Sequence, residues 1–128
     1  RQFRLPPLLN GDAPDLLEVC AGLLDSEAPA IAAAREALEE TGHEPKGVRH
    51  VCDIYTCPGS LTEKVSLFLG VYDRTTLRHA GGGLEHEGEE IELVELDFPD
   101  ALAMTRDGRI VDAKTIILLQ HLALQQSG

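Results

Sequence analysis

The sequence predicts an α/β protein, because segments typical of strands alternate with segments typical of helices along its 128 residues. Residues 48–55 and 65–72 are rich in β-branched and aromatic side chains, which favour strands. Residues 29–41 are rich in alanine and lie between a proline and a glycine, as helices often do. The length fits a single domain over residues 1–128.

The N-terminal part is predicted to contain two short strands. Residues 1–5 and 16–20 are the strand candidates, and residues 6–14 carry the Pro-Pro and Asn-Gly signals of a loop. A second loop is expected from residue 21 to about residue 28. Because the chain begins at Arg1 inside a predicted strand and without methionine, we expect native residues to precede it.

The central helix has clear start and stop signals. Pro29 suits the first turn and Gly42 is a favourable stop. Three apolar side chains fall on one face of this helix: Ile31, Ala34 and Leu38.

The C-terminal part begins with a glycine-rich acidic loop, residues 81–90. Residues 91–98 alternate apolar and acidic side chains, as an exposed or edge strand does. A short helix is predicted over residues 99–105. Asp112 is placed to cap a last helix that ends near residue 125. Three side chains of that helix are expected to point inward: Ile116, Leu119 and Leu122.

The composition argues against a nucleic-acid-binding surface, because the net charge is −11. An acidic protein is expected to repel a polyphosphate unless a divalent cation offsets the repulsion.

No apolar run reaches the roughly 20 residues that a membrane span needs, and no signal peptide is visible. The chain contains three cysteines and no CxxC pair, which predicts reduced, buried thiols in a cytoplasmic protein. The cysteines are Cys20, Cys52 and Cys57, and the histidines lack the spacing of a zinc site.

Three carboxylates share one side of the central helix, because Glu36, Glu39 and Glu40 stand at positions i, i+3 and i+4. Each like-charged pair destabilises a helix by about 0.2–0.5 kcal/mol, and a helix C-terminus prefers cations. Two interpretations remain open. One is an ordinary solvated acidic face. The other is a site for Mg²⁺, which is commonly held by one or two carboxylates and substrate phosphates.

The same helix resembles the signature of the Nudix hydrolases, G-x5-E-x7-R-E-U-x-E-E-x-G-U, in which U is a bulky aliphatic residue. The matching residues, in the family's spacing, are Glu27, Arg35, Glu36, Glu39, Glu40 and Gly42. The chain departs from the signature at three points. Four residues instead of five separate Gly22 from Glu27, Ala37 replaces a bulkier residue, and His43 stands where a hydrophobic residue is usual.

The resemblance implies a Nudix-type α/β/α sandwich with a mixed sheet and a Mg²⁺ or Mn²⁺ cofactor. It implies that Glu36 and Glu40 ligate the metal, together with the carbonyl of Ala21. Glu39 would ligate it or lie just behind. Arg35 and Glu27 would form a structural pair that holds the loop to the helix, with direct phosphate contact as the alternative for Arg35. Gly22 and Gly42 would be structural.

Two further segments match the family. The family carries a catalytic glutamate on a loop like residues 81–90, and by position Glu87 resembles the general base and Glu89 a further metal ligand. Glu85, Glu89 and Glu90 remain alternatives for the base. Pro58 lies fifteen residues beyond His43, a placement that resembles the branch acting on ADP-ribose and related nucleotide sugars.

Five stretches are similar to the Nudix subgroup that acts on GDP-mannose: residues 1–4, 18–25, 57–59, 80–83 and 112–115. The resemblance implies hydrolysis of GDP-mannose to GMP and mannose 1-phosphate by a homodimer whose N-terminal strands are missing from this chain. Arg4 is a candidate for holding a phosphate or the sugar, and Glu18 for binding a sugar hydroxyl or that arginine. The alternatives are a surface arginine and a structural carboxylate. The competing functions are an ADP-ribose pyrophosphatase and a sensor that binds a nucleotide sugar without cutting it.

Overall fold

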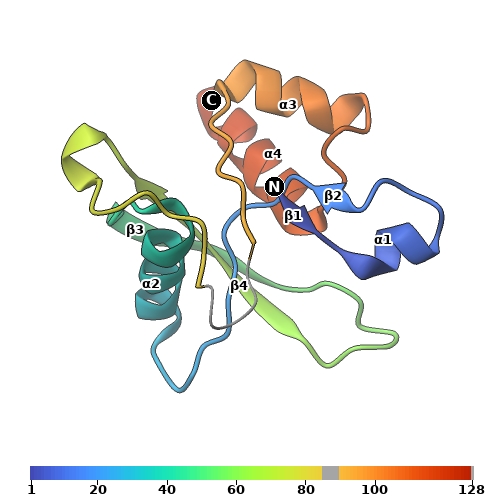
Figure 1. The fold of residues 1–128 in the computed structure, drawn as a ribbon, viewed down its shortest axis with the longest axis horizontal. Coiled ribbons are helices and arrows are strands. Elements are labelled where there is room, and N and C mark those ends of the chain that lie inside the picture. Colours follow the sequence, from blue (N-terminus) through green and yellow to red (C-terminus); the bar gives the residue numbers. More distant parts are fainter. Residues whose placement is uncertain (85–89, 128) are drawn as a thin grey trace. The chain divides into compact units, whose positions relative to one another are not determined.

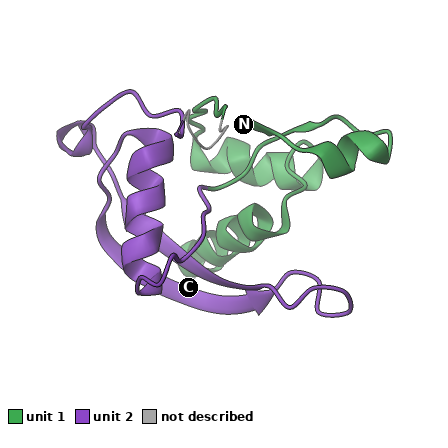
Figure 2. Cartoon of the chain, turned by 60° about the horizontal axis from the view of Figure 1, so that its bottom comes forward, with its two compact units in different colours: residues 1–19, 90–128 green, residues 20–89 purple. Residues whose placement is uncertain are grey.

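The computed structural model describes residues 1–84 and 90–127, which form two compact units. One unit contains Arg1–Val19 and Glu90–Gly128, and the other contains Cys20–Glu89 (Figure 2). We call them the terminal unit and the central unit. The signature residues Glu27 to Gly42 therefore all lie in the central unit.

The central unit is built on one helix and one hairpin (Figure 1). Helix α2 (Pro29–Thr41) packs against both strands of the hairpin, β3 (Lys46–Tyr55) and β4 (Lys64–Val71). The strands are antiparallel, with Tyr55 opposite Lys64 and Lys46 opposite Val71. A short 3-10 helix, η1 (Arg74–Thr76), follows β4 and was not predicted.

Helix α2 has the predicted bounds, because its start and stop signals are local. Pro29 occupies the first turn, and Gly42 ends the helix in the left-handed conformation with φ of 76°. The apolar residues that share one face of the helix are not its most buried residues. Ile31 is 60% exposed, whereas the buried residues of α2 are Ala32, Glu36 and Glu40. The face that carries two of the three carboxylates is therefore the buried face.

The terminal unit begins with two short antiparallel strands, β1 (Gln2–Phe3) and β2 (Asp15–Leu16). Between them lies helix α1 (Leu5–Leu9), so the prediction of a loop over residues 6–14 is wrong for its first part. Two consecutive prolines do not prevent this helix, because both occupy its first turn, where no amide donor is needed.

Two packed helices complete the terminal unit. Helix α3 (Phe98–Arg106) and helix α4 (Ala113–Ser127) lie close to their predicted bounds. The carboxylate of Asp112 accepts the amide of Thr115 at 3.0 Å, which confirms the predicted cap. The most buried positions of α4 are Thr115 and Leu118, and the three side chains expected to point inward are half-buried.

Residues 91–98 do not form the expected strand. The only ladder contact within this segment is an isolated antiparallel bridge between Ile91 and Gln2. Among the described residues, both sheets are two-stranded and antiparallel, so the parallel pairing of a mixed sheet is absent from them.

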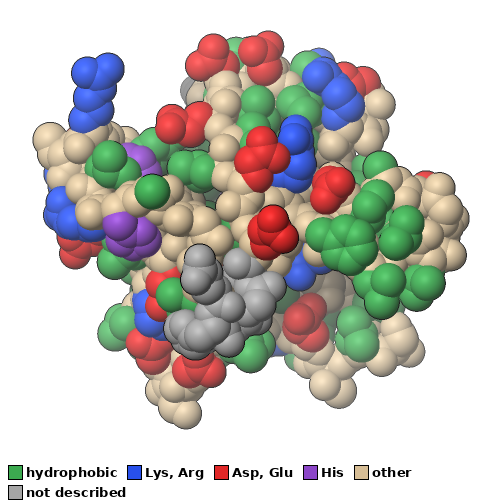
Figure 3. Space-filling model, viewed as in Figure 1, with side chains coloured by type: hydrophobic (Ala, Val, Ile, Leu, Met, Phe, Trp, Pro, Cys, Tyr) green, Lys and Arg blue, Asp and Glu red, His purple; other side chains and the backbone are tan. Residues whose placement is uncertain are grey.

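The thiols are free, as expected, but two of them are not buried. Cys20 and Cys57 are exposed and Cys52 is half-buried. Among the helices of the described residues, none is both long and apolar enough to cross a membrane. On the face drawn in Figure 3, Asp and Glu side chains are scattered among the other side chains.

Candidate active site

The buried carboxylates of α2 are the most unusual feature of the central unit. Glu36 and Glu40 stand one turn apart, and each is only 8% exposed. A carboxylate that leaves water loses several kcal/mol of hydration, so it persists only where cations or hydrogen-bond donors replace the water. This burial contradicts an ordinary solvated acidic face for these two residues. Glu39, with 23% of its side chain exposed, is half-buried.

The loop before α2 lies directly against one of these carboxylates. A Cβ atom built on Gly22 would come within 1.9 Å of the carboxyl carbon of Glu36 and within 2.0 Å and 2.3 Å of its oxygens. Only glycine leaves room for this approach. The backbone that follows Ala21 is therefore held beside the Glu36 carboxylate, even though the loop is one residue shorter than the signature.

We expect Gly22→Ala to weaken the site, because the added methyl group must displace the Glu36 carboxylate. Disturbing the surroundings of a metal ligand costs about 10–100-fold in metal affinity, so if Glu36 ligates a divalent cation, the dissociation constant for Mn²⁺ measured by titration calorimetry should rise by that factor. The control is Gly59→Ala, since a Cβ atom there meets nothing within 4 Å. Equal dissociation constants for Mn²⁺ in the two variants would contradict the prediction.

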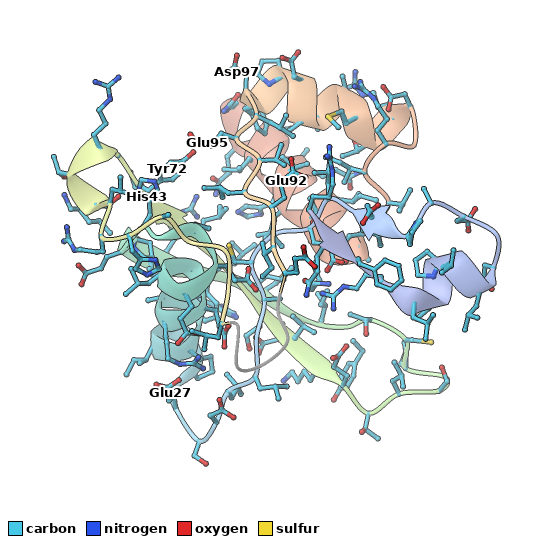
Figure 4. The ribbon with its side chains drawn as sticks, viewed as in Figure 1. Glu27, His43, Tyr72, Glu92, Glu95 and Asp97 are labelled. Carbon is cyan, nitrogen blue, oxygen red and sulfur yellow. The ribbon has the colours of Figure 1, made fainter. Side chains whose placement is uncertain are left out.

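Arg35 holds the loop to the helix. Its guanidinium donates to Glu27 Oε2 at 2.8 Å, to Glu39 Oε2 at 3.1 Å and to the carbonyl oxygen of Leu23 at 3.1 Å. It also forms an ion pair with Glu36 Oε1 at 2.8 Å. The hydrogen bond to Glu27 and the neighbouring carboxylates raise the pKa of Arg35. Glu27 lies beside the start of α2 in Figure 4.

The thiol of Cys20 lies beside the second buried carboxylate. Crowding by protein atoms disfavours the thiolate, and the charge and hydrogen bonding of Glu40 add to this effect. Together they raise the pKa of Cys20 to about 12, although the residue keeps an exposed surface. Cys20 is therefore a neutral thiol near neutral pH and not a nucleophile.

The donor set suits a hard divalent cation. The carboxylates of Glu36 and Glu40 are oxygen ligands, which Mg²⁺ prefers, and substrate phosphates usually complete its coordination. Within residues 1–84 and 90–127, no group of three or more His, Cys, Asp or Glu side chains is arranged to hold a metal ion. The structure buries two of the three α2 carboxylates, Glu36 and Glu40, on one face of the helix. Glu87 and Glu89, the predicted base and further ligand, lie outside the described residues.

The other predicted residues lie apart from the signature in sequence. Pro58 is in the turn that connects β3 to β4, where the amide of Leu61 donates to the carbonyl of Cys57 at 2.8 Å. Arg4 and Glu18 belong to the terminal unit. They bind each other through two hydrogen bonds of 2.7 Å and 3.0 Å.

Residue spacing does not reveal the neighbours of the Arg4–Glu18 pair. Lys114 Nζ lies 3.7 Å from Glu18 Oε2 and donates to Asp112 Oδ1 at 2.7 Å. Burial opposes ionisation of Asp112, but the hydrogen bonds from Lys114 and Thr115 outweigh it and lower its pKa. The signal available was the similarity of residues 112–115 to the subgroup, which marked the segment without assigning its side chains a role.

Comparison with known proteins identifies the family. The chain belongs to the Nudix family, since the family described as NUDIX domain matches residues 3–117. This match and the helices and strands of both units confirm the predicted α/β Nudix fold class.

The chain is also similar to proteins named GDP-mannose pyrophosphatase. It is 46% identical to that of Cronobacter sakazakii over 127 residues, which cover 98% of this chain and 65% of that protein. It is 46% identical to that of Pectobacterium atrosepticum over 126 residues, with shares of 98% and 64%. It is 42% identical to that of Escherichia coli O1:K1 over 125 residues, with shares of 97% and 64%. The chain thus spans less than two thirds of these relatives' length.

Proposed function

We propose that this chain is the metal-binding part of a Nudix hydrolase that cuts the pyrophosphate bond of a nucleoside diphosphate sugar. The observation that carries the proposal is the burial of Glu36 and Glu40 on one face of α2, with Gly22 packed against the Glu36 carboxylate. Water would attack one phosphorus while the bond from that phosphorus to the bridging oxygen breaks, which gives two phosphate monoesters.

Glu36, Glu40 and the carbonyl of Ala21 would hold Mg²⁺, or Mn²⁺ in its place. The cation would supply charge neutralisation for the pyrophosphate and a lower pKa for the attacking water. The protein's own contribution is to hold two carboxylates at fixed places in a site with little solvent. Such a cation would also offset the repulsion between a polyanion and a chain whose net charge is −11.

Arg35 would hold the loop that carries Ala21 in position, rather than contact a phosphate. Its guanidinium already binds Glu27, Glu39 and the Leu23 carbonyl, which supports the structural pair and leaves direct phosphate contact without support from the geometry. Glu39 shares this guanidinium, so we assign it a place just behind the metal ligands. It would orient Arg35, and through Arg35 the loop that carries Ala21.

The proton acceptor in this proposal is Glu87, with Glu89 as a further metal ligand. Both rest on the position of the acidic loop in the sequence. A positioned carboxylate that accepts the proton of the attacking water contributes about 10²–10⁴-fold to the rate. Glu85, Glu89 and Glu90 remain alternatives for the same role.

Arg4 would bind a phosphate or the sugar, and Glu18 would position Arg4. The bidentate hydrogen bond between them supports the second role of Glu18, that of a partner for the arginine. The side chain of Glu18 is 9% exposed, whereas that of Arg4 is 42% exposed. The arginine is therefore the member of the pair that is accessible to a ligand.

GDP-mannose is the substrate we propose, with GMP and mannose 1-phosphate as products. The names of the similar proteins support this choice.

We further propose that the full-length protein is a cytoplasmic homodimer, on the basis of the resemblance to the subgroup. Sedimentation of the full-length protein tests the dimer.

The function is tested by following nucleoside monophosphate release from GDP-mannose and from ADP-ribose, each with Mg²⁺ and with EDTA. We expect faster, Mg²⁺-dependent release from GDP-mannose. Faster release from ADP-ribose would move the substrate to that nucleotide sugar. Binding of either compound without release, in this chain and in the full-length protein, would replace the hydrolase with a sensor.

A further inference from the structure

The C-terminal end of α2 is covered by a backbone segment from a distant part of the central unit. The amides of Arg78 and His79 donate to the carbonyl of Gly42 at 2.7 Å and 3.4 Å. The amide of Gly82 donates to the carbonyl of Glu40 at 2.8 Å, and that of Gly83 to the carbonyl of Glu39 at 3.2 Å. We call residues 78–83 the capping strap.

The strap is anchored by a buried polar network. Thr76 is fully buried, and its hydroxyl lies 2.9 Å from Nδ1 of His43, the residue after the helix stop. The Thr76 hydroxyl also donates to the carbonyl of Asp73 at 2.8 Å. The ring of His43 lies beside that of Tyr72, with centroids 4.8 Å apart (Figure 4). The strap therefore starts from a fixed point next to the helix end.

This helix end needs external support. The last carbonyl groups of any helix lack partners within the helix, and its C-terminus carries partial negative charge. Helix α2 has no basic residue in its last turn, and its three glutamates add like-charge repulsion. The strap supplies amide donors to the carbonyls of two of those glutamates, Glu39 and Glu40.

The strap can approach this closely only because its last three residues are glycines. Gly81, Gly82 and Gly83 all have positive φ, at 74°, 109° and 80°. A Cβ atom on Gly81 would lie 2.6 Å from the carbonyl oxygen of Glu40 and 2.6 Å from the carbonyl carbon of Thr41. Both are backbone atoms, which cannot rotate away as the end of a side chain can. The close approach and the left-handed backbone are both compatible only with glycine.

We propose that Gly81, Gly82 and Gly83 are positioning residues for the divalent-cation site. They cap the last turn of α2 and so hold the Glu40 carboxylate where it can ligate the cation. This inference rests on the proposed function, because it assumes that Glu36 and Glu40 bind the metal. It assigns the three glycines a role in supporting the end of helix α2.

The test compares Mn²⁺ binding by Gly81→Ala and by Gly47→Ala, measured by titration calorimetry on the chain without substrate. Gly47 also has a positive φ, 58°, but a Cβ atom there meets nothing within 4 Å. Both variants therefore carry the cost of a left-handed alanine, and only Gly81→Ala pushes the strap off the helix. We expect the dissociation constant to rise about 10–100-fold in Gly81→Ala, as for other changes behind metal ligands, and to stay unchanged in Gly47→Ala.

A second readout separates positioning from a general loss of structure. If Gly81→Ala acts on metal affinity, a large excess of Mg²⁺ should restore its turnover number. Equal metal affinity in the two variants, in a chain that hydrolyses GDP-mannose, would contradict the inference about the capping strap. The proposed function would not be affected. A wild-type chain that binds no Mn²⁺ would overturn the proposed metal site itself, and the strap inference with it.

Amide hydrogen exchange on the wild-type chain decides the question if Gly81→Ala does not fold. Metal binding and capping are linked if both favour the same helix end. We therefore expect the amides of Gly82 and Gly83 to be protected and to exchange more slowly when Mg²⁺ is bound. Unprotected amides, or rates that bound Mg²⁺ does not change, would overturn the inference.

Discussion

Replacing Glu40 with glutamine should reduce the turnover of GDP-mannose by at least about 10²–10⁴-fold, the range typical of a group that takes part directly in the chemistry. Glutamine keeps the shape of the side chain but removes one negative charge and one strong ligand. At 8% exposure, the site has little water to replace that ligand. The measurement is the initial rate as a function of Mg²⁺ concentration.

The matched control for this variant is Glu63→Gln. Glu63 is exposed in the same unit and accepts a hydrogen bond from Thr56 at 3.0 Å, so it undergoes the same chemical change away from the helix. We expect its rate to equal that of the wild type. If Glu40→Gln retained more than about a tenth of the wild-type rate, which is a change of only about 1.4 kcal/mol in the barrier, Glu40 would not be a metal ligand.

Replacing Glu87 with glutamine should reduce turnover by about 10²–10⁴-fold, the usual contribution of a general base. The physical reason differs from that for Glu40, because the amide cannot accept the proton of the attacking water. The affinity for Mg²⁺ should therefore be close to that of the wild type. The acidic limb of the pH–rate profile, which reports protonation of the base, should disappear.

The remaining glutamates of the acidic loop serve as parallel variants. Glu85→Gln, Glu89→Gln and Glu90→Gln are measured under the same conditions. A loss of Mg²⁺ affinity in Glu89→Gln would support its place as a further ligand. If one of these variants lost the acidic limb while Glu87→Gln retained it, the base would be that residue instead.

Local signals explain most of what the sequence predicted. The bounds of α2 follow from Pro29 and Gly42, and the cap of α4 follows from Asp112, because each feature depends on side chains within one turn. The strands β3 and β4 also lie near their predicted ranges, since the predicted segments combine β-branched with aromatic residues.

Long-range contacts explain the errors. The apolar face shared by Ile31, Ala34 and Leu38 is not the most buried face of α2, because the packing of α2 on the hairpin buries Ala32 and the two glutamates instead. Alternation over residues 91–98 predicted a strand, but a strand needs a partner ladder, and the described residues provide a single bridge at Ile91. Neither result can be predicted from the local pattern, because each depends on which distant segment packs against α2 or pairs with residues 91–98.

The candidate site also combines features that local sequence signals reveal with features that depend on long-range contacts. The register of the signature was enough to nominate Arg35, Glu36 and Glu40. The contacts between Gly82 and Glu40, and between His43 and Thr76, join residues 42 and 33 positions apart in sequence. No spacing rule connects such residues, so only the folded chain brings them to notice.

The buried acidic face of α2 makes thermal stability and catalytic turnover conflicting requirements. Substituting apolar side chains of similar volume for buried charged groups is often neutral or stabilising. A search for stabilised variants of this chain would therefore favour changes such as Glu40→Met, which fill the same space without a buried charge. Those changes would remove the oxygen donors on which the proposed reaction depends, so heat resistance and turnover compete at the same two positions.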